Sequence, residues 1–147
     1  METMVEYKRE KKLDINTGSI FIVDDDILYL SPLAEYVKRR FKNPVYSFTS
    51  GEECISKMEL KPKIVILDYN LNPQWPDTMN GPDVLKQIKK ISPETVVVML
   101  SGRDLYTDVL RTLKLGAYTY VIKDIEANDS IYKIIEAFCG SNRIGSI

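Results

Sequence analysis

Residues 19–26 read SIFIVDDD, an apolar run that ends in three aspartates. β-Branched and aromatic side chains favour strands, and an unbroken apolar run fits a strand buried on both faces of a sheet. The segment KIVILD at residues 63–68 repeats this pattern and also ends in an aspartate. Two buried strands that each end in a carboxylate therefore predict both the fold class and the place of its chemistry.

Three more short apolar segments predict strands, at residues 45–48, 95–100 and 118–122. Amphipathic patterns predict helices over residues 27–41, 51–60, 81–91, 105–116 and 130–139. Strands that alternate with helices indicate an α/β fold: a doubly wound, five-stranded parallel sheet of the flavodoxin-like (βα)5 type. Five such units are too few to close an eight-stranded barrel.

Two of these helices have clear apolar stripes. The helix over 81–91 is predicted to turn four side chains toward a core: Val84, Leu85, Ile88 and Ile91. The helix over 105–116 offers Leu105, Val109 and Leu113 at helical spacing. We therefore expect both helices to pack on the sheet through these stripes.

The composition is that of one ordinary globular domain. The chain has 147 residues, 44% hydrophobic and 28% charged, and 20 Lys and Arg against 21 Asp and Glu give a net charge of −1. This balance argues against a broad surface for nucleic acid or for anionic lipid. The chain has no histidine, which excludes histidine chemistry and a role as a phosphohistidine donor.

The ends of the chain predict no membrane anchor. Residues 1–18 are polar and lack an apolar signal core, and no segment approaches the ~20 apolar residues of a membrane span. We expect a cytoplasmic protein with an N-terminal tail over 1–18, one domain over 19–140 and a C-terminal tail over 141–147. Cys54 and Cys139 lie in separate apolar segments and are expected to be small buried hydrophobes.

In open α/β sheets, ligands bind at the carboxyl ends of the strands. The first predicted strand ends in residues 24–26, the third in Asp68, the fourth in Ser101 and the fifth in Lys123. The strand order 2-1-3-4-5 fits, because it brings the carboxylates of strands one and three within roughly 5 Å of each other. Only a long side chain such as Lys123 could then reach Asp68 from strand five.

The acidic side chains need a counter-charge. Close carboxylates repel each other and either take up a proton or bind a cation. Oxygen ligands without His or Cys select Mg²⁺ or Mn²⁺. We expect Asp25 and Asp68 to face each other across this site, whereas Asp26, just before a helix, is expected to cap that helix.

Four motifs together resemble a known family. FIVDDD at 21–26, the apolar strand into Asp68, the pair at 101–102 and YVIK ending at Lys123 follow one another as in the receiver domain of two-component response regulators, which is CheY-like. The resemblance runs from about residue 19 to residue 139. It implies a phosphorylation-dependent signalling domain that is not an enzyme, beyond promoting its own phosphorylation and dephosphorylation.

The resemblance assigns the phosphoryl site. It implies that Asp68 is the phosphoacceptor, whose carboxylate attacks a phosphohistidine on a partner. It also implies a Mg²⁺ or Mn²⁺ ion held by Asp25, Asp68 and the backbone carbonyl of Asn70, with Asp24 acting through water. Lys123 would then pair with Asp68 or with the phosphoryl group.

The resemblance also assigns a switch and partners. Ser101 is similar to the switch hydroxyl, and Tyr120 to the aromatic residue that turns inward when this hydroxyl moves. The implied output is a changed surface over residues 105–116, 118–122 and 130–139. The expected partners are a sensor histidine kinase or phosphotransfer protein, and a downstream target or C-terminal output domain if the chain is a fragment. A homodimer through the same surface is a further expectation, without direct nucleic-acid or membrane binding.

Two features depart from the family pattern. Asp124 follows Lys123 where receivers commonly have proline, and the stretch from Asp68 to Gly81, which includes Trp75, is several residues longer than usual. We expect these features to alter the loop geometry and the docking of the partner.

Three other functions remain open. One is a pseudo-receiver that acts only as an interaction module. Another is a haloacid-dehalogenase-like phosphatase, although Asn70 stands where its general acid would be. An FMN-binding flavodoxin is the third, although three aspartates at the end of the first strand would repel a phosphate.

Overall fold

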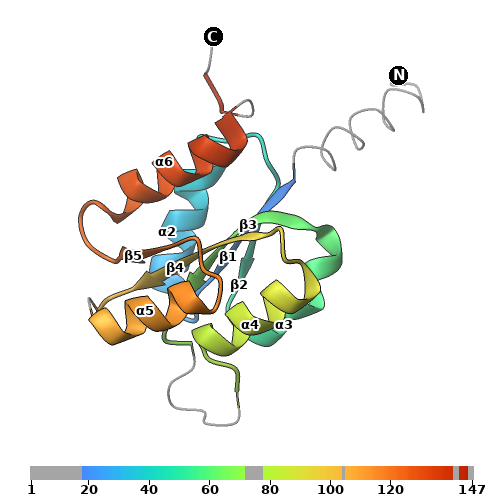
Figure 1. Cartoon of the computed structure of the whole chain (residues 1–147). Helices are drawn as coiled ribbons and strands as arrows, with labels where there is room; N and C mark the ends of the chain where they lie inside the picture. Colours follow the sequence, from blue (N-terminus) through green and yellow to red (C-terminus); the bar gives the residue numbers. More distant parts are fainter. Residues whose placement is uncertain (1–17, 72–77, 104, 141–142, 146–147) are drawn as a thin grey trace.

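The computed structural model describes residues 18–71, 78–103, 105–140 and 143–145. Its centre is one parallel sheet in the order β2-β1-β3-β4-β5, with helices on both faces (Figure 1). The sheet confirms the predicted doubly wound, flavodoxin-like α/β fold. The strands are β1 Ser19–Val23, β2 Val45–Phe48, β3 Pro62–Asp68, β4 Val96–Ser101 and β5 Thr119–Ile122.

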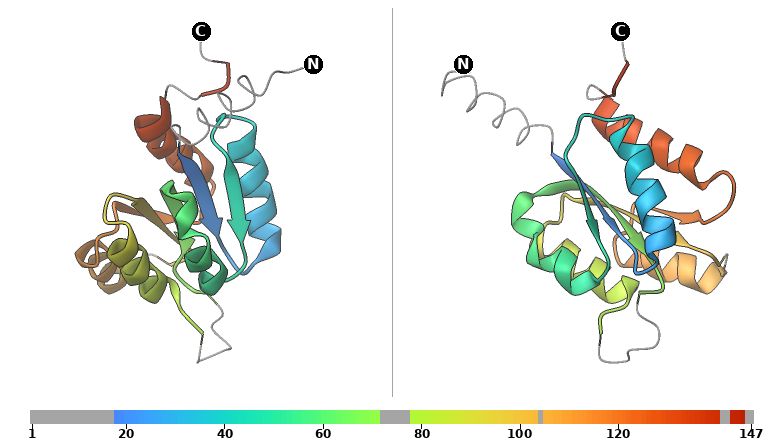
Figure 2. Two further views of the ribbon diagram at one scale, coloured as in Figure 1. Left: turned by 90° about the vertical axis from the view of Figure 1, so that its right-hand side faces the viewer. Right: turned by 180° about the vertical axis from the view of Figure 1, so that it is seen from behind.

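The helices follow the strands as the alternation predicts. They are α2 Ile27–Lys38, α3 Gly51–Ser56, the 3₁₀ turn η1 Met58–Leu60, α4 Gly81–Ile91, α5 Tyr106–Lys114 and α6 Ala127–Cys139. Helices α2 and α6 cover one face of the sheet, and α3, α4 and α5 cover the other (Figures 1 and 2).

Alternate residues of each buried strand point into two separate cores. From β1, Ile20 and Ile22 pack toward α2 and α6, whereas Phe21 and Val23 pack toward α3 and α4. The strands therefore need apolar side chains on both faces, which explains their unbroken apolar runs. Cys54 and Cys139 are both buried in these cores, as predicted.

The register of the sheet brings the strand ends together. Val23 of β1 lies opposite Leu67 of β3, so the residues that follow them emerge side by side. In the same way, Asp68 lies opposite Leu100 of β4, and Ser101 opposite Ile122 of β5. The chain thus delivers its polar strand ends to one edge of the sheet.

Several helix boundaries differ from the prediction, since α2 ends at Lys38 and not at residue 41, and α5 spans only Tyr106–Lys114. The helix expected over 51–60 breaks after Ser56 into a 3₁₀ turn, and Lys61 then adopts a left-handed backbone with φ 50°. The last helix begins at Ala127 and not at Ser130, because Asp124 accepts hydrogen bonds from the N–H groups of Glu126 and Ala127 and starts the helix earlier.

The predicted helix stripes were partly wrong. Ile91 is 51% exposed, since it is the last residue of α4 and lies at the edge of the stripe centred on Val84 and Ile88. Leu105 and Leu113 are also exposed, because α5 presents these side chains away from the sheet.

The long connection between β3 and α4 is held at both ends. Leu71 is buried at its start. At its end, Glu52 of α3 accepts a hydrogen bond of 2.7 Å from the N–H of Met79, and Asn80 caps α4. Residues 72–77, with Trp75, lie outside the described residues.

The described residues near the C-terminus contact the segment that follows α2. Phe41 and Arg143 form an isolated antiparallel bridge, and the N–H of Ile144 donates to the carbonyl of Arg40 at 2.6 Å. Among all described residues, no helix combines the length and apolar character that a membrane crossing requires.

Candidate functional site

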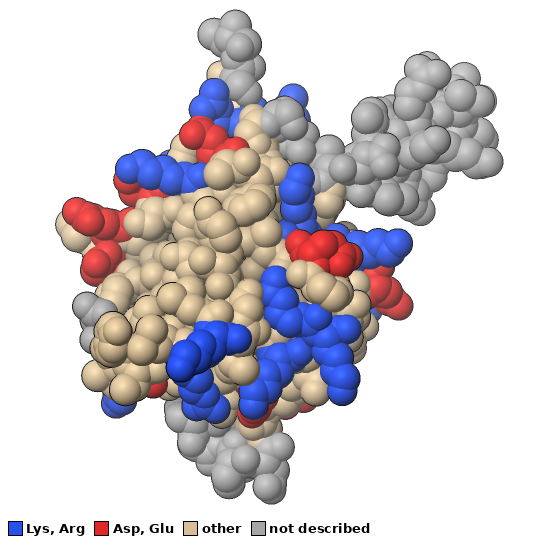
Figure 3. Space-filling view, in the orientation of Figure 1, with Lys and Arg blue, Asp and Glu red and all other residues tan. Residues whose placement is uncertain are grey.

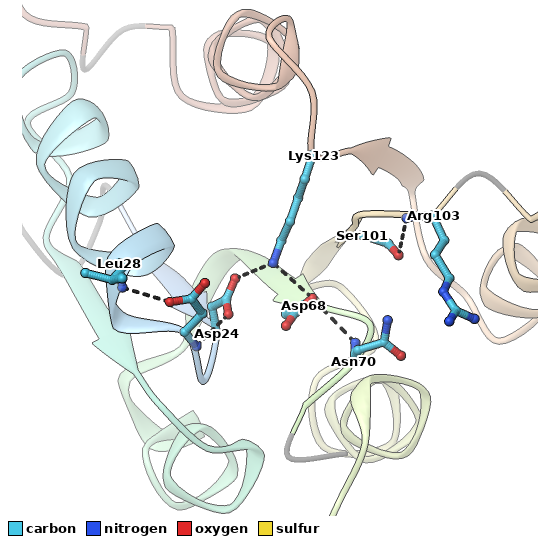
Figure 4. A network of polar contacts seen from close by, with 8 residues as sticks. Asp24, Leu28, Asp68, Asn70, Ser101, Arg103 and Lys123 are labelled. Carbon is cyan, nitrogen blue, oxygen red and sulfur yellow. Dashed lines mark hydrogen bonds and ion pairs between the residues drawn. The ribbon is translucent and has the colours of Figure 1, made fainter. Parts of the chain in front are cut away.

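Three carboxylates meet at the carboxyl edge of the sheet. Asp24 follows β1, Asp68 ends the neighbouring β3, and Asp25 lies in the turn after Asp24. One carboxylate oxygen of each lies within 4.8 Å of the other two. Asp24 and Asp68 are 1% and 5% exposed, so the cluster is partly withdrawn from water. The structure thus brings together the acidic residues predicted from the strand ends, and Figure 4 shows two of them, Asp24 and Asp68.

The turn after β1 is fixed by its own aspartates. Asp24 Oδ1 accepts from the N–H of Asp26 at 2.9 Å, and Asp26 Oδ1 accepts from the N–H of Leu28 at 3.0 Å. The second bond makes Asp26 the N-cap of α2, which confirms its predicted role. Of the three consecutive aspartates, Asp24 and Asp25 therefore belong to the carboxylate cluster, and Asp26 caps α2.

Lys123 reaches this cluster from the end of β5 (Figure 4). Its Nζ lies 2.8 Å from Asp24 Oδ2 and 3.4 Å from Asp68 Oδ1. The ammonium is therefore closer to Asp24 than to Asp68, its predicted partner. It also lies over the ring of Tyr29 of α2, 4.4 Å from the centroid.

Burial and neighbouring charges shift the pKa values of Asp68 and Lys123. Burial and the nearby charge of Asp24 raise the pKa of Asp68 to about 6, against the opposing effect of Lys123. Burial disfavours the ammonium of Lys123, but its hydrogen bond to Asp24 and the charge of Asp68 outweigh burial and raise its pKa. Three carboxylates around one ammonium leave an excess of negative charge.

The donor set fits a hard divalent cation. The clustered groups are all carboxylates, and Mg²⁺ and Mn²⁺ prefer oxygen ligands. Both contacts of Asp68 with described residues, to Lys123 and to the N–H of Asn70 at 3.4 Å, fall on Oδ1. The other oxygen of Asp68 is therefore available for a ligand.

Gly81 determines how closely α4 approaches the site. A Cβ atom at this position would lie 2.5 Å from the carbonyl oxygen of Asp68 and 2.6 Å from that of Tyr69. The N–H of Gly81 also donates to the Tyr69 carbonyl at 3.1 Å. The sequence indicated Gly81 only as a helix start, whereas the structure shows that glycine lets α4 pack against the backbone that carries Asp68.

Both predicted switch residues hydrogen-bond with the backbone of Arg103, which follows β4. Ser101 is buried, and its Oγ accepts from the N–H of Arg103 at 3.2 Å. The half-buried Tyr120 donates its hydroxyl hydrogen to the Arg103 carbonyl at 2.8 Å. The Arg103 side chain points away from the carboxylates (Figure 4).

The loop after Lys123 closes without proline. The described residues contain no cis peptide bond. The N–H of Asp124, which a proline would lack, donates to the Ile122 carbonyl at 2.8 Å. The departure from the family pattern therefore gives this loop a backbone hydrogen bond that proline cannot make.

Two tyrosines near the site were missed by the sequence reasoning. Tyr29 contacts Lys123, and Tyr69, which follows Asp68, donates its hydroxyl hydrogen to Asp108 of α5 at 3.0 Å. The adjacency of Tyr69 to Asp68 was a signal in the sequence. No spacing rule links Tyr29 to Lys123, because they are 94 positions apart (123 − 29).

Comparison with known proteins agrees with this geometry. Residues 20–136 match the sequence profile of the response regulator receiver domain. The transcriptional regulatory protein CssR of Bacillus subtilis is 32% identical over 116 residues, which cover 79% of this chain and 49% of CssR. The chemotaxis protein CheY of Thermotoga maritima is 29% identical over 119 residues, which cover 80% of this chain and 92% of CheY. The chain therefore spans about half the length of CssR but most of CheY.

A solved structure shows the same fold. The BeF3-activated DrrB receiver domain superimposes with a TM-score of 0.72 at 28% identity, over 84% of this chain and 97% of that domain. DrrB itself is described as a Thermotoga maritima OmpR/PhoB homologue. Because the profile spans 20–136 and the sheet order is the one that the residues at the strand ends predicted, the chain belongs to the response regulator receiver domains of two-component systems.

Proposed function

We propose that this chain accepts a phosphoryl group on Asp68 from a histidine kinase or phosphotransfer protein and signals through a changed surface. The observation that carries this proposal is the meeting of three carboxylates and one ammonium at the carboxyl edge of the sheet. A regulatory phosphoacceptor, and not a turnover enzyme, is the role that fits the family.

In the proposed reaction, an oxygen of Asp68 attacks the phosphorus of a phosphohistidine. The new O–P bond forms as the P–N bond breaks, and the electron pair of that bond stays on the imidazole nitrogen. Lys123, within 3.4 Å of Asp68, can follow the charge onto the phosphoryl oxygens. The protein contributes position and charge compensation.

A Mg²⁺ or Mn²⁺ ion would be held by Asp25, Asp68 and the carbonyl of Asn70, with Asp24 acting through water. Asp24 suits this indirect role, because its two oxygens already accept from Asp26 and Lys123. When bound, such an ion neutralises charge on the phosphoryl oxygens. Gly102 has no atom within 4 Å of its would-be Cβ, which leaves space beside the acceptor.

We infer that Ser101 and Tyr120 form the switch. An added phosphoryl group brings about −1.5 to −2 charges and three acceptor oxygens, enough to attract the Ser101 hydroxyl. That movement would break the bond from the Arg103 N–H and loosen the segment on which Tyr120 rests.

The surface formed by α5, β5 and α6 is the proposed output. It exposes apolar side chains, and few charged groups lie between α5 and α6 (Figure 3). Such a patch suits a target protein, an attached output domain or a second copy of the chain. The exposed apolar members are Tyr106, Leu110, Leu113 and Tyr118.

Two exposed apolar side chains follow the strand ends that carry the site, and we propose that they contact the phosphodonor. Leu28 and Ile125 are 83% and 99% exposed, and each lies within four positions of Asp24 or Lys123. Replacing Leu28 and Ile125 by Ala should slow labelling by a phosphorylated partner but leave labelling by acetyl phosphate unchanged.

We assign the domain to residues 19–140, with segments over 1–18 and 141–147 outside it.

The direct test is incubation with radiolabelled acetyl phosphate and Mg²⁺. We expect one phosphoryl group per chain and none in Asp68→Asn. Asp129→Asn is the matched control, because Asp129 is an exposed aspartate on α6, paired with Lys133. Label that persists in Asp68→Asn would contradict the assignment. An unlabelled chain would favour a pseudo-receiver, and turnover of a phosphate monoester would favour a phosphatase.

A second test uses the raised pKa of Asp68. Its pKa is about 6 in the folded protein against an ordinary 3.8, so between pH 4 and 6 the folded state binds more protons than the unfolded state. In metal-free buffer this carboxyl therefore lowers the free energy of unfolding as pH rises through that window. Asp68→Asn should remove the decrease and gain at most about 3 kcal/mol at pH 7 by urea unfolding. Equal pH profiles for both proteins would contradict the raised pKa of Asp68.

A further inference from the structure

The ammonium of Lys123 has a neighbour besides the two carboxylates. Nζ lies 4.4 Å from the ring centroid of Tyr29, inside the ~6 Å range of cation–π attraction. Tyr29 lies in the first turn of α2, three positions after the N-cap Asp26. The ring therefore reaches the site from a helix whose start is fixed by the same aspartate turn.

The surroundings strengthen this contact. The Lys123 side chain is 18% exposed, and a partly desolvated ammonium gains more from an aromatic face than a hydrated one does. Tyr29 is itself half-buried and packs against the core between α2 and α6. Packing against the core therefore helps to hold the ring in place.

A ring face differs from a carboxylate as a partner. A hydrogen bond to Asp24 holds the ammonium in one direction, whereas the ring attracts it over a broad area. An ammonium resting on a ring can therefore exchange one oxygen partner for another without entering bulk water. Phosphorylation of Asp68 requires such an exchange, since new oxygens arrive beside the carboxylate that Lys123 contacts.

We propose that Tyr29 is the positioning residue for Lys123 in phosphoryl transfer. Its ring holds the ammonium at the carboxylates and keeps it within reach of the incoming phosphoryl oxygens. The inference rests on the proposed function, because it concerns the same acceptor site. The phenol hydroxyl has no part in it.

The same helix provides a matched control. Tyr36 of α2 also has a cation over its ring, with Arg40 Cζ at 3.6 Å from the centroid, but its partner is not part of the carboxylate site. Replacing Tyr36 by Leu removes a tyrosine ring and a cation–π contact from α2 without touching Lys123. Any loss shared by both variants therefore reports on the helix and not on the site.

The experiment measures the rate of Asp68 labelling by acetyl phosphate at saturating Mg²⁺. We expect Tyr29→Leu to slow labelling about tenfold, Tyr29→Phe to stay within about twofold, and Tyr36→Leu to match the parent chain. The affinity for Mg²⁺ should remain within about twofold in all three. A Tyr29→Phe variant as slow as Tyr29→Leu, or a Tyr29→Leu variant as fast as the parent, would overturn the proposal.

A graded series separates ring electronics from packing. Phenylalanine with one, two and three ring fluorines at position 29 keeps the shape of the ring while draining the negative charge from its face. We expect the rate to fall stepwise with each fluorine, and an equal rate across the series would overturn the proposal even if Tyr29→Leu does not fold. If the parent chain takes no label, or Asp68→Asn keeps it, the proposed function fails. If labelling is normal but insensitive to position 29, only this inference fails.

Discussion

Helices α4 and α5 lie side by side on one face of the sheet, yet they are held very differently (Figure 2). Both have an apolar stripe in a polar sequence. In α4, Val84, Leu85 and Ile88 are fully buried, and Asn80 and Asp83 form a reciprocal capping box. In α5 the only buried residue is Thr112, and the N-cap Leu105 provides no side-chain hydrogen bond.

The difference shows that an amphipathic pattern does not by itself fix how deeply a helix is buried. Helix α4 packs against the backbone that carries Asp68, whereas α5 leaves apolar side chains exposed near the proposed switch. Few buried contacts and an uncapped end give a low free energy of local opening. We therefore expect α4 to act as the fixed support of the site and α5 as the element that responds.

The largest expected effect comes from Gly81→Ala. The new Cβ would meet the backbone oxygens of Asp68 and Tyr69 at 2.5 and 2.6 Å, and backbone cannot move aside as a flexible side chain can. We expect a loss of about 3 kcal/mol or more in the free energy of unfolding, measured with urea. Gly102→Ala, where no atom lies within 4 Å, should change stability by less than about 1 kcal/mol. Similar losses in the two variants would refute a special role for Gly81.

Truncation inside each helix tests the contrast in burial. Ile88→Ala should cost about 2–5 kcal/mol, because Ile88 is fully buried and its loss leaves a cavity. Leu113→Ala, in α5, removes a side chain that is 42% exposed and should cost less than about 1 kcal/mol. Urea unfolding of both variants is the measurement. Equal costs would show that α5 is as firmly packed as α4.

Exchange of the helix caps should act in opposite directions. Asn80→Ala removes the bond from the Asp83 N–H and should lower stability by about 1 kcal/mol. Leu105→Asp places a capping carboxylate on an extended backbone, with φ −96° and ψ 118°, and should raise the stability of α5 by about 0.5–1 kcal/mol. Amide exchange resolves the second effect, because it reports α5 separately. Unchanged amide exchange in α5 would mean that the backbone N–H groups of its first turn already have other hydrogen-bond partners.

The smallest expected effect is that of Tyr69→Phe. The change removes the hydrogen bond to Asp108, which ties the residue after the proposed phosphoacceptor to α5, and should cost about 1 kcal/mol or less. We expect faster amide exchange in α5 and no change in α4. Tyr106→Phe, on the exposed side of α5, is the control and should change neither helix. Faster amide exchange in α4 would show that Tyr69 stabilises α4 and would contradict its assignment to α5.

Local sequence patterns were enough to predict the sheet and its order. The apolar runs must be buried in the sheet, and the alternation of strands and helices then allows only a few topologies. Strand-end positions also predicted which polar residues would meet, since Asp24, Asp68 and Lys123 leave neighbouring or next-nearest strands at one edge.

Features that depend on tertiary packing were not predictable in this way. The exposure of Leu113 depends on how far α5 approaches the sheet, and the contact of Tyr29 with Lys123 depends on the tilt of α2 over β5. The steric need for glycine at position 81 depends on another backbone passing within van der Waals distance. Propensity and periodicity carry no information on such contacts.

The two anchors of the β3–α4 connection, Leu71 in the core and Met79 bonded to Glu52, have a practical meaning for engineering. A segment whose ends are independently fastened can change in length without displacing what comes before or after it. A peptide tag or fluorophore inserted between Leu71 and Met79 should therefore leave α4 in register. The extra length of this chain between Asp68 and Gly81 thus offers a place to mount a reporter of the proposed phosphorylation.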